Sequence, residues 1–264
     1  MHTGVGRMKR RARLALSVTA GVFLIAASSA AFPAEEPSAT PYRPSVSNPA
    51  ALPVPGYFEV EAGFERTKDT DPRRRDSFPV LLKYAFTENI GVLLGGDAHV
   101  RQYSDINGKT TGVGDTSLTL KLHHALNDQI ALGLEAGVKI PTAKDLIGSG
   151  KYDRTVTGIV SAELGKADLD LNLGVTRLGA VDPGESRTEY TWAAALSYPI
   201  SERWVISGEL SAVTQRGAPT TSQFLTAVSY NVSKRVVLDA GMAWGLNNAS
   251  IDRTIFAGMT VLLK

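Results

Sequence analysis

Apolar and polar residues alternate with a period of two along most of the chain. Between positions 130 and 140 (IALGLEAGVKI) the even positions are apolar, and the odd positions hold alanine, glycine or a charged residue. The same alternation recurs at 169–176 and 236–245. Successive side chains of a β-strand point to opposite faces, so this pattern predicts strands with two chemically different faces. After the N-terminal segment no window shows a sustained helical period, which predicts an all-β fold.

About twelve such segments follow Gly56, each about ten residues long, which suits tilted strands that cross a bilayer. They are 57–66, 76–87, 90–102, 114–126, 130–142, 154–166, 169–180, 188–200, 204–216, 222–232, 236–247 and 252–263. Strands of soluble proteins average only about 5–6 residues. The lengths therefore favour a membrane barrel.

Short and long connections alternate between these segments. Tight turns are predicted at 88–89, 127–128, 167–168, 202–203 and near Lys234. The longer connections, rich in glycine, proline and charge, are 66–76, 104–112, 143–153, 181–187 and 217–222. Outer-membrane barrels have short periplasmic turns and long external loops. An even number of strands then predicts that both ends of the barrel lie on the short-turn rim.

The positions that alternate with the apolar ones, which we call the polar parity, carry small residues and isolated charges of both signs. The aqueous interior of a barrel has this composition. The predicted lumen-lining residues are Glu59, Glu61, Lys83, Asp97, His99, Arg101, Lys121, Glu135, Lys139, Glu163, Asp170, Glu209 and Asp239. On the apolar parity, aromatic residues near segment ends predict interfacial girdles: Phe78, Phe86, Trp192, Tyr198, Trp204, Tyr230 and Trp244. Lipid offers no hydrogen-bond partners, so every backbone N–H and C=O group of a spanning sheet must pair within the protein. The sheet therefore has to close. We predict a transmembrane antiparallel β-barrel of about twelve strands, with a soluble secreted sandwich as the alternative.

The N-terminus has the three parts of a signal peptide. Basic residues between Arg7 and Arg13 precede the apolar run 14–27, and small residues follow at 28–31. We expect a signal peptide over 1–31, cleaved near Ala30 or Ala31, with Met1 or Met8 as the start; a retained anchor is the alternative. Removing its five basic residues changes the formal net charge from +2 to −3. The mature chain therefore has no basic surface that points to nucleic acid.

Residues 32–55 (FPAEEPSATPYRPSVSNPAALPVP) are rich in proline, alanine and serine. Proline fixes φ and removes a backbone donor, so the segment is expected to form neither helix nor sheet. It is either an extended periplasmic arm or a plug that folds back into the barrel, and both alternatives remain open. The barrel itself is expected to span 56–264.

Several short motifs occur in a recognisable order: Arg43-Pro44, Glu59-Val60-Glu61, Gly114-Asp115-Thr116, Lys139-Ile140-Pro141-Thr142, Gly148-Ser149-Gly150 and Asp239-Ala240-Gly241. Over residues 43–264 the chain resembles the outer-membrane proteins of the MetA-pathway of phenol degradation, or phenol-degradation transporter-like, family. The resemblance implies a protein of the bacterial outer membrane that aids the passage of small, often aromatic or hydrophobic, compounds.

We therefore expect a channel or transporter-like barrel that is not an enzyme and needs neither cofactor nor metal. The expected partners are outer-membrane lipid and lipopolysaccharide, the barrel-assembly machinery that reads the C-terminal strand, and a small-molecule solute. A structural or surface-interaction barrel with a filled lumen is the alternative. A membrane-embedded lipid hydrolase is third, with His124 as its base, although no serine lies in a nucleophile motif. Arg73-Arg74-Arg75 is either a solvated charge run or a contact for lipopolysaccharide phosphates.

Overall fold

The computed structural model describes residues 36–264, so the expected signal peptide over 1–31 lies outside the described residues. Thirteen strands form one antiparallel sheet within this part of the chain. They are β1 (Phe58–Lys68), β2 (Arg74–Ala85), β3 (Ile90–Ser104), β4 (Gly108–Gly112), β5 (Thr116–Ala125), β6 (Ile130–Ile140), β7 (Asp153–Leu164), β8 (Ala167–Arg177), β9 (Thr188–Pro199), β10 (Trp204–Gln215), β11 (Thr221–Ser233), β12 (Val236–Gly245) and β13 (Arg253–Leu263).

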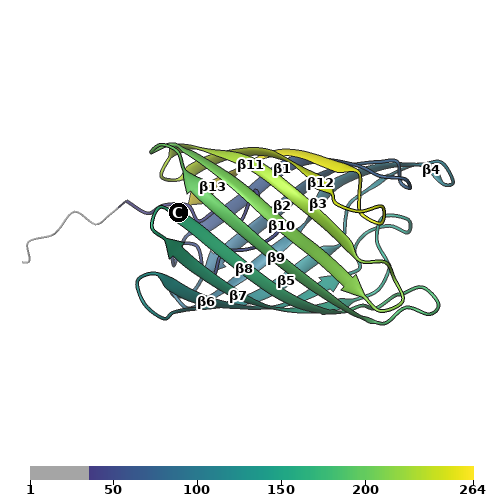
Figure 1. Ribbon diagram of the computed structural model, residues 1–264, viewed down its shortest axis with the longest axis horizontal. Coiled ribbons are helices and arrows are strands. Elements are labelled where there is room, and N and C mark those ends of the chain that lie inside the picture. Colours follow the sequence, from purple (N-terminus) through teal and green to yellow (C-terminus); the bar gives the residue numbers. More distant parts are fainter. Residues whose placement is uncertain (1–35) are drawn as a thin grey trace, which may run out of the picture. The chain divides into compact units, whose positions relative to one another are not determined.

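The sheet closes into a barrel of twelve strands (Figure 1). Apart from β4, which pairs only with β3, each strand of the barrel pairs with the next one along the chain. The barrel closes where β1 pairs with β13, from Phe58↔Leu263 to Lys68↔Arg253. Closure leaves no unpaired edge, as a sheet in lipid requires. The predicted transmembrane antiparallel barrel is confirmed.

The thirteenth strand, β4, lies where the sequence pattern predicts the loop 104–112. It pairs with the end of β3 from Val100↔Gly112 to Ser104↔Gly108 and extends that strand beyond the barrel (Figure 1). Gly108 has a φ of 67°, which allows the tight turn. The β-branched residues Thr110 and Thr111 then suit an extended chain. Closer to the membrane centre β5 replaces β4 as the partner of β3.

The outward face of the strands is apolar, as the alternation predicts. Leu118, Leu120 and Leu122 of β5, for example, are 39–46 % exposed. An exposed apolar surface that continues from strand to strand is suited to hydrocarbon rather than to water. Within residues 36–264, no helix is long and apolar enough to cross a membrane.

A β-bulge at Ala98 interrupts the alternation in β3. Asp97 pairs with Pro79, whereas His99 pairs with Phe78, so Ala98 is the extra residue. The two residues therefore lie on opposite faces of the sheet although both have odd numbers. His99 and Arg101 were expected to line the lumen, and this expectation is wrong because the bulge turns them outward.

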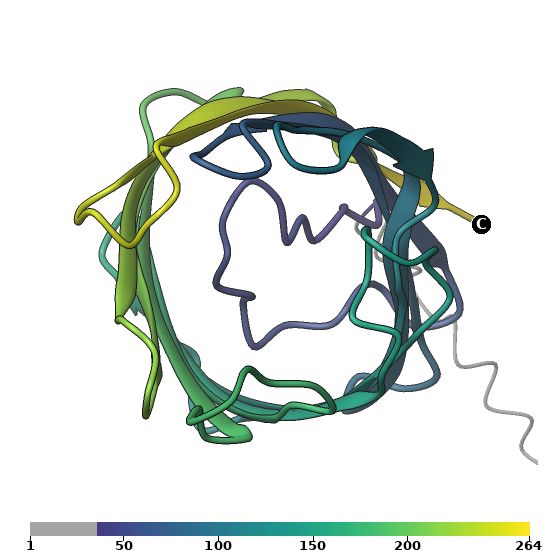
Figure 2. The same cartoon turned by 90° about the vertical axis from the view of Figure 1, so that its right-hand side faces the viewer.

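The segment before the barrel runs inside the ring of strands (Figure 2). We call residues 36–55 the arm. It begins at the short-turn rim, where the Ala39 N–H donates to the Lys234 carbonyl in the β11–β12 turn. It ends at the same rim, where the Gly56 N–H donates to the carbonyl of Ala85 at the end of β2. Between these two points the arm forms a loop in the lumen.

Candidate functional site

Charges are strongly segregated between the two faces of the barrel wall. Ladder pairing places twelve strand carboxylates on the inward parity: Glu59, Glu61, Glu65, Asp97, Glu135, Asp153, Glu163, Asp168, Asp170, Glu189, Glu209 and Asp239. Four basic strand residues share that parity, namely Arg75, Lys83, Lys121 and Lys139. The lumen of the described barrel is therefore acidic.

Two buried lysines pair with wall carboxylates on the inner face of the barrel. Lys83 lies 2.5 Å from carboxylate oxygens of both Glu59 and Glu61. Lys121 lies 2.9 Å from Glu135. Both lysine side chains are 0 % exposed. Charges buried this completely persist only when they are paired and hydrogen-bonded, so the pairs define a rigid part of the wall.

The backbone N–H groups of the arm donate to wall side chains. Those of Thr40 and Tyr42 donate to Glu59 and Glu61 over 2.8 and 2.6 Å. Val46 and Ser47 both donate to Glu209 over 2.8 Å. Similar bonds join Asn48 to Asn172 and Ala50 to Ser161. Because its prolines prevent regular pairing, the arm satisfies its backbone through side chains of the barrel.

The carbonyl groups of the arm accept from the buried lysines. Lys83 donates to Thr40 and Lys121 donates to Pro49, each over 2.6 Å. Both ammonium groups lie against the Tyr42 ring, that of Lys83 at 3.7 Å and that of Lys121 at 4.1 Å from the ring centroid. Burial, reinforced by nearby carboxylates, raises the pKa of the Tyr42 hydroxyl well above its usual value. The hydroxyl therefore stays protonated and donates to the Ala51 carbonyl.

Arg43 anchors the arm to the neighbouring part of the wall, formed by β1, β13 and β12. Its guanidinium donates two hydrogen bonds to Asp239 on β12, over 3.1 and 3.2 Å. It lies against Gly63 of β1 and Gly258 of β13, where an added Cβ would come within 2.8 and 2.6 Å of guanidinium nitrogens. The inward glycines at these positions thus form a slot for Arg43.

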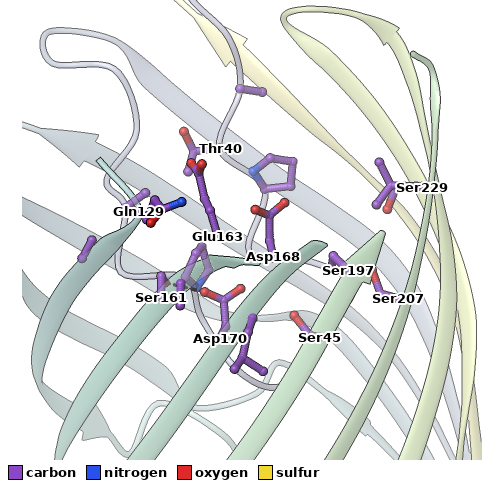
Figure 3. A pocket seen from close by; sticks show the side chains of 18 of the residues that line it. Thr40, Ser45, Gln129, Ser161, Glu163, Asp168, Asp170, Ser197, Ser207 and Ser229 are labelled. Atoms are coloured by element: carbon purple, nitrogen blue, oxygen red, sulfur yellow. Dashed lines mark hydrogen bonds between the residues drawn. The ribbon is translucent and has the colours of Figure 1, made fainter. Parts of the chain in front are cut away.

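A cavity of about 680 Å³ lies at the short-turn rim between the arm and the wall. Its lining includes the carboxylates of Glu163, Asp168 and Asp170 (Figure 3). Hydroxyl groups come from serines of four wall strands and of the arm: Ser45, Ser161, Ser197, Ser207 and Ser229. The cavity is large enough for a small-molecule solute and is polar on its wall side.

Two smaller cavities lie on the long-loop side of the arm. One of about 350 Å³ is lined by Asp97, Asp115 and arm residues that include Tyr42 and Asn48. Arg43 and Ser45 line both this cavity and the larger one. Another, of about 330 Å³, lies between Val46 and the ends of β9 to β11. The arm therefore separates cavities that lie towards the two rims.

The predicted lumen residues occupy three regions. Glu59, Glu61, Lys83, Lys121, Glu135, Glu209 and Asp239 surround the arm. Glu163 and Asp170 line the cavity at the short-turn rim. Asp97 and Lys139 lie towards the long loops, where Lys139 bridges Asp115 and Asp153 and Asp97 pairs with Arg75. Sequence reasoning missed several inward residues, although they share the parity of predicted ones: Glu65, Arg75, Asp153, Ser161, Asp168, Asn172 and Glu189.

The predicted girdle residues all lie on the outer face. Phe86, Tyr198, Trp204 and Tyr230 are near the short turns, and Phe78, Trp192 and Trp244 are nearer the long loops. Trp204 packs on Tyr230 with ring centroids 4.6 Å apart. Further outward aromatics, which the expected set omits, are Phe58, Phe64, Tyr84, Tyr190 and Phe224. Both rims of the wall thus carry aromatic side chains, as barrels in lipid do.

His124 lies on the outer face near the short-turn rim. It is exposed, and its cross-strand partner in β6 is Leu132. In the described part of the chain, its ring forms no hydrogen bond to a serine. This position suits an interfacial histidine.

The comparisons with known proteins agree with this architecture. The family model described as "Putative MetA-pathway of phenol degradation" matches residues 42–263. The chain belongs to this family. The match to the phenol-degradation family begins at Tyr42, so it includes the arm residue whose ring lies against both wall lysines. No curated protein matches the chain.

Solved structures show which barrels share the fold. The KdgM porin in complex with disordered oligogalacturonate aligns with a TM-score of 0.54 and 11 % identity, covering 77 % of this chain and 98 % of that one. The CymD monoaromatic hydrocarbon channel aligns with a TM-score of 0.50 and 10 % identity, covering 80 % of this chain and 89 % of that one. At such identities the likeness shows the fold, a closed barrel resembling outer-membrane porins.

Proposed function

We propose that this member of the phenol-degradation family is an outer-membrane channel for small molecules, with the arm as its constriction. The observation that carries the proposal is the presence of cavities on both sides of the arm. Arg43 and Ser45 line the cavity towards the short turns and a cavity towards the long loops. A solute that crosses the barrel would pass between arm and wall, or would displace the arm.

The chemistry of the lumen narrows the class of solute. Twelve inward carboxylates and four inward basic residues make the wall unfavourable for anions. The family description and the shared fold of a monoaromatic hydrocarbon channel favour an aromatic solute. Both features fit an aromatic compound that enters uncharged, such as a phenol, better than an aromatic acid.

The proposed orientation in the outer membrane is inferred from the rim at which the chain enters and leaves the barrel. The arm begins and ends at the short-turn rim, and Leu263 pairs with Phe58 there. An exported chain with a cleaved leader over 1–31 would place this rim in the periplasm and the long loops outside. The assembly machinery that we expect to read the C-terminal strand would act from the same side.

Ion conductance in planar bilayers tests the channel. The mature protein should show openings, and deletion of residues 36–55 should raise its single-channel conductance severalfold because the arm leaves the lumen. The wall lysines keep Glu59, Glu61 and Glu135 as partners, so the shortened barrel is expected to fold. Deletion of residues 182–185 in the β8–β9 loop is the control and should leave conductance unchanged.

A structural barrel with a filled lumen is the second candidate, favoured by the many bonds between arm and wall. It predicts no openings and no solute flux for the complete mature protein. Folded protein that stays silent, with or without the arm, would exclude the channel. Openings of the complete protein would exclude the structural alternative.

A further inference from the structure

Basic residues gather on the outer face of the barrel near the long-loop rim. The strand registers place five basic residues on this face: Arg66 and Lys68 of β1, Arg74 of β2, Arg101 of β3 and Arg253 of β13. The alternation of the wall would otherwise place apolar side chains here. Five cations on four neighbouring strands therefore form a distinct surface, which we call the outer basic patch.

On its strands the patch is nearly free of negative charge, and the acidic residues next to it, Asp69, Asp71 and Asp252, lie in the adjoining loops. Among the strands of residues 36–264, Asp76 is the one carboxylate on the outward parity. It is shared by Arg66, at 2.6 Å, and Arg74, at 2.5 Å. No strand carboxylate within this part of the chain is left to neutralise Lys68, Arg101 and Arg253, which are exposed.

The register arranges the patch in two rows that run across the strands. One row follows the pairs Arg253↔Lys68, Lys68↔Arg74 and Arg74↔Tyr103. The other follows Arg66↔Asp76 and Asp76↔Arg101. The bulge at Ala98 is essential, because without it Arg101 would point into the lumen. The position of Arg101 is thus a consequence of the fold that the alternation alone does not give.

Aromatic residues lie on the membrane side of these rows. Phe64 precedes Arg66 by two residues on the same face, and the Arg66 guanidinium lies 5.4 Å from its ring centroid. Phe78 and its partner His99 occupy the corresponding place on β2 and β3. Within the first of these rows itself, the Arg74 guanidinium lies 5.2 Å from the ring centroid of its partner Tyr103. Cations above aromatic rings at a rim match the boundary between acyl chains and headgroups.

The outward cations are unevenly distributed around the rim. Away from the patch, the cross-strand partners Arg154 of β7 and Arg177 of β8 also point outward. On β9 to β11 the outward residues near this rim are uncharged: Tyr190, Trp192, Thr214, Ser222 and Phe224. A general need for solubility would distribute charges of both signs around the whole rim. Five cations on β13, β1, β2 and β3 instead indicate a particular anionic partner.

We propose that the outer basic patch binds the phosphate groups of the outer-leaflet glycolipid, the lipid A part of lipopolysaccharide. The inference rests on the proposed outer-membrane channel only for its orientation, because the long loops must face outside. A phosphorylated glycolipid has both parts that the surface matches. Its phosphates pair with the guanidinium and ammonium groups, and its acyl chains lie against the apolar wall below.

Binding of purified lipid A to the folded, detergent-solubilised mature protein tests the proposal, with retention measured by native mass spectrometry. The triple variant Lys68→Gln, Arg101→Gln, Arg253→Gln removes three cations and leaves the pairing of Asp76 intact. Three lost charges should weaken retention on the order of 100-fold. The control Lys166→Gln, Arg203→Gln, Lys234→Gln removes three cations from the short turns and should bind like the unmodified protein.

The unmodified protein supplies a second, independent comparison. It should retain bisphosphorylated lipid A far better than dephosphorylated lipid A or phosphatidylglycerol, and millimolar inorganic phosphate should not displace the lipid. Equal retention of any of these lipids, displacement by free phosphate, or unweakened binding by the triple variant would each overturn the proposal. None of these readouts depends on conductance, so a silent barrel that still binds lipid A would refute only the channel.

Discussion

At the scale of single residues, the main feature is the way in which two buried lysines organise the lumen. Lys83 and Lys121 pair with wall carboxylates, donate to arm carbonyls and lie against the Tyr42 ring. Each lysine thus has an anion, a carbonyl and an aromatic face as partners. This explains how a flexible cationic side chain can be completely buried within a barrel that is otherwise acidic.

Loss of Lys83 should destabilise the barrel strongly. Lys83→Met leaves the carboxylates of Glu59 and Glu61 buried without their cation, so we expect the free energy of unfolding to fall by about 3–5 kcal/mol. The measurement is denaturant unfolding of the barrel in lipid vesicles.

The control is Lys166→Met in the exposed β7–β8 turn, which should change stability by no more than about 0.5 kcal/mol. The triple variant Lys83→Met, Glu59→Gln, Glu61→Gln removes the buried charges together and should recover much of the loss. If Lys83→Met behaves like Lys166→Met, the ion pairs do not contribute to stability.

At the scale of elements, β3 departs most from its sequence pattern. Its first half follows the alternation, with Leu93 buried and Leu94 exposed. After the bulge at Ala98 the parity is inverted, so Val100 and Gln102 point inward and Arg101 points outward. The same strand then continues beyond the barrel to pair with β4.

Fluorescence quenching can test this inversion, because the chain contains no cysteine of its own. A fluorophore attached through His99→Cys should be quenched by lipid carrying a shallow nitroxide several times more strongly than one attached through Asp97→Cys. The control pair Asp170→Cys and Asn172→Cys, which spans no bulge, should be quenched alike and weakly. Equal quenching at 97 and 99 would show that β3 has no parity change.

At the scale of the whole molecule, the two faces of the wall have opposite electrostatic character. Carboxylates are concentrated on the lumen side, and Asp76 is the one strand carboxylate on the outer face of the described barrel. The arm adds Arg43 beside Asp239 but leaves the cavity at the short-turn rim acidic. This charge distribution has a direct consequence for permeation.

The proposed channel should select cations and uncharged solutes over anions. In a potassium chloride gradient we expect a reversal potential of cation-selective sign, and the variant Glu163→Gln, Asp168→Asn, Asp170→Asn should lower the cation-to-anion permeability ratio by about a factor of two or more. In liposome swelling, the neutral phenolic glycoside arbutin should enter faster than 4-hydroxybenzoate.

A matched control neutralises three exposed carboxylates that do not line this cavity: Glu88→Gln, Asp105→Asn, Glu202→Gln. Its permeability ratio should equal that of the unmodified protein. Anion selectivity, or faster entry of 4-hydroxybenzoate, would contradict the assignment of the lumen carboxylates to the permeation path.

The sequence by itself determined the strands, their approximate ends and the apolar outer face, because the alternation of side chains is a local property of extended chain. It also predicted that Glu59, Lys83 and Lys121 face inward, since they lie on regular parts of their strands. It could not predict the face on which His99 and Arg101 lie, because the bulge in β3 arises from the pairing of β3 with β2.

Only the tertiary structure decided where the arm lies. The sequence left arm and plug open, because the segment has no periodicity of its own. Its position depends on contacts such as that between Arg43 and Asp239, which are 196 residues apart in the chain. The outer basic patch has the same origin. Its cations are brought together by closure of β1 onto β13 and by the bulge in β3, which no local pattern records.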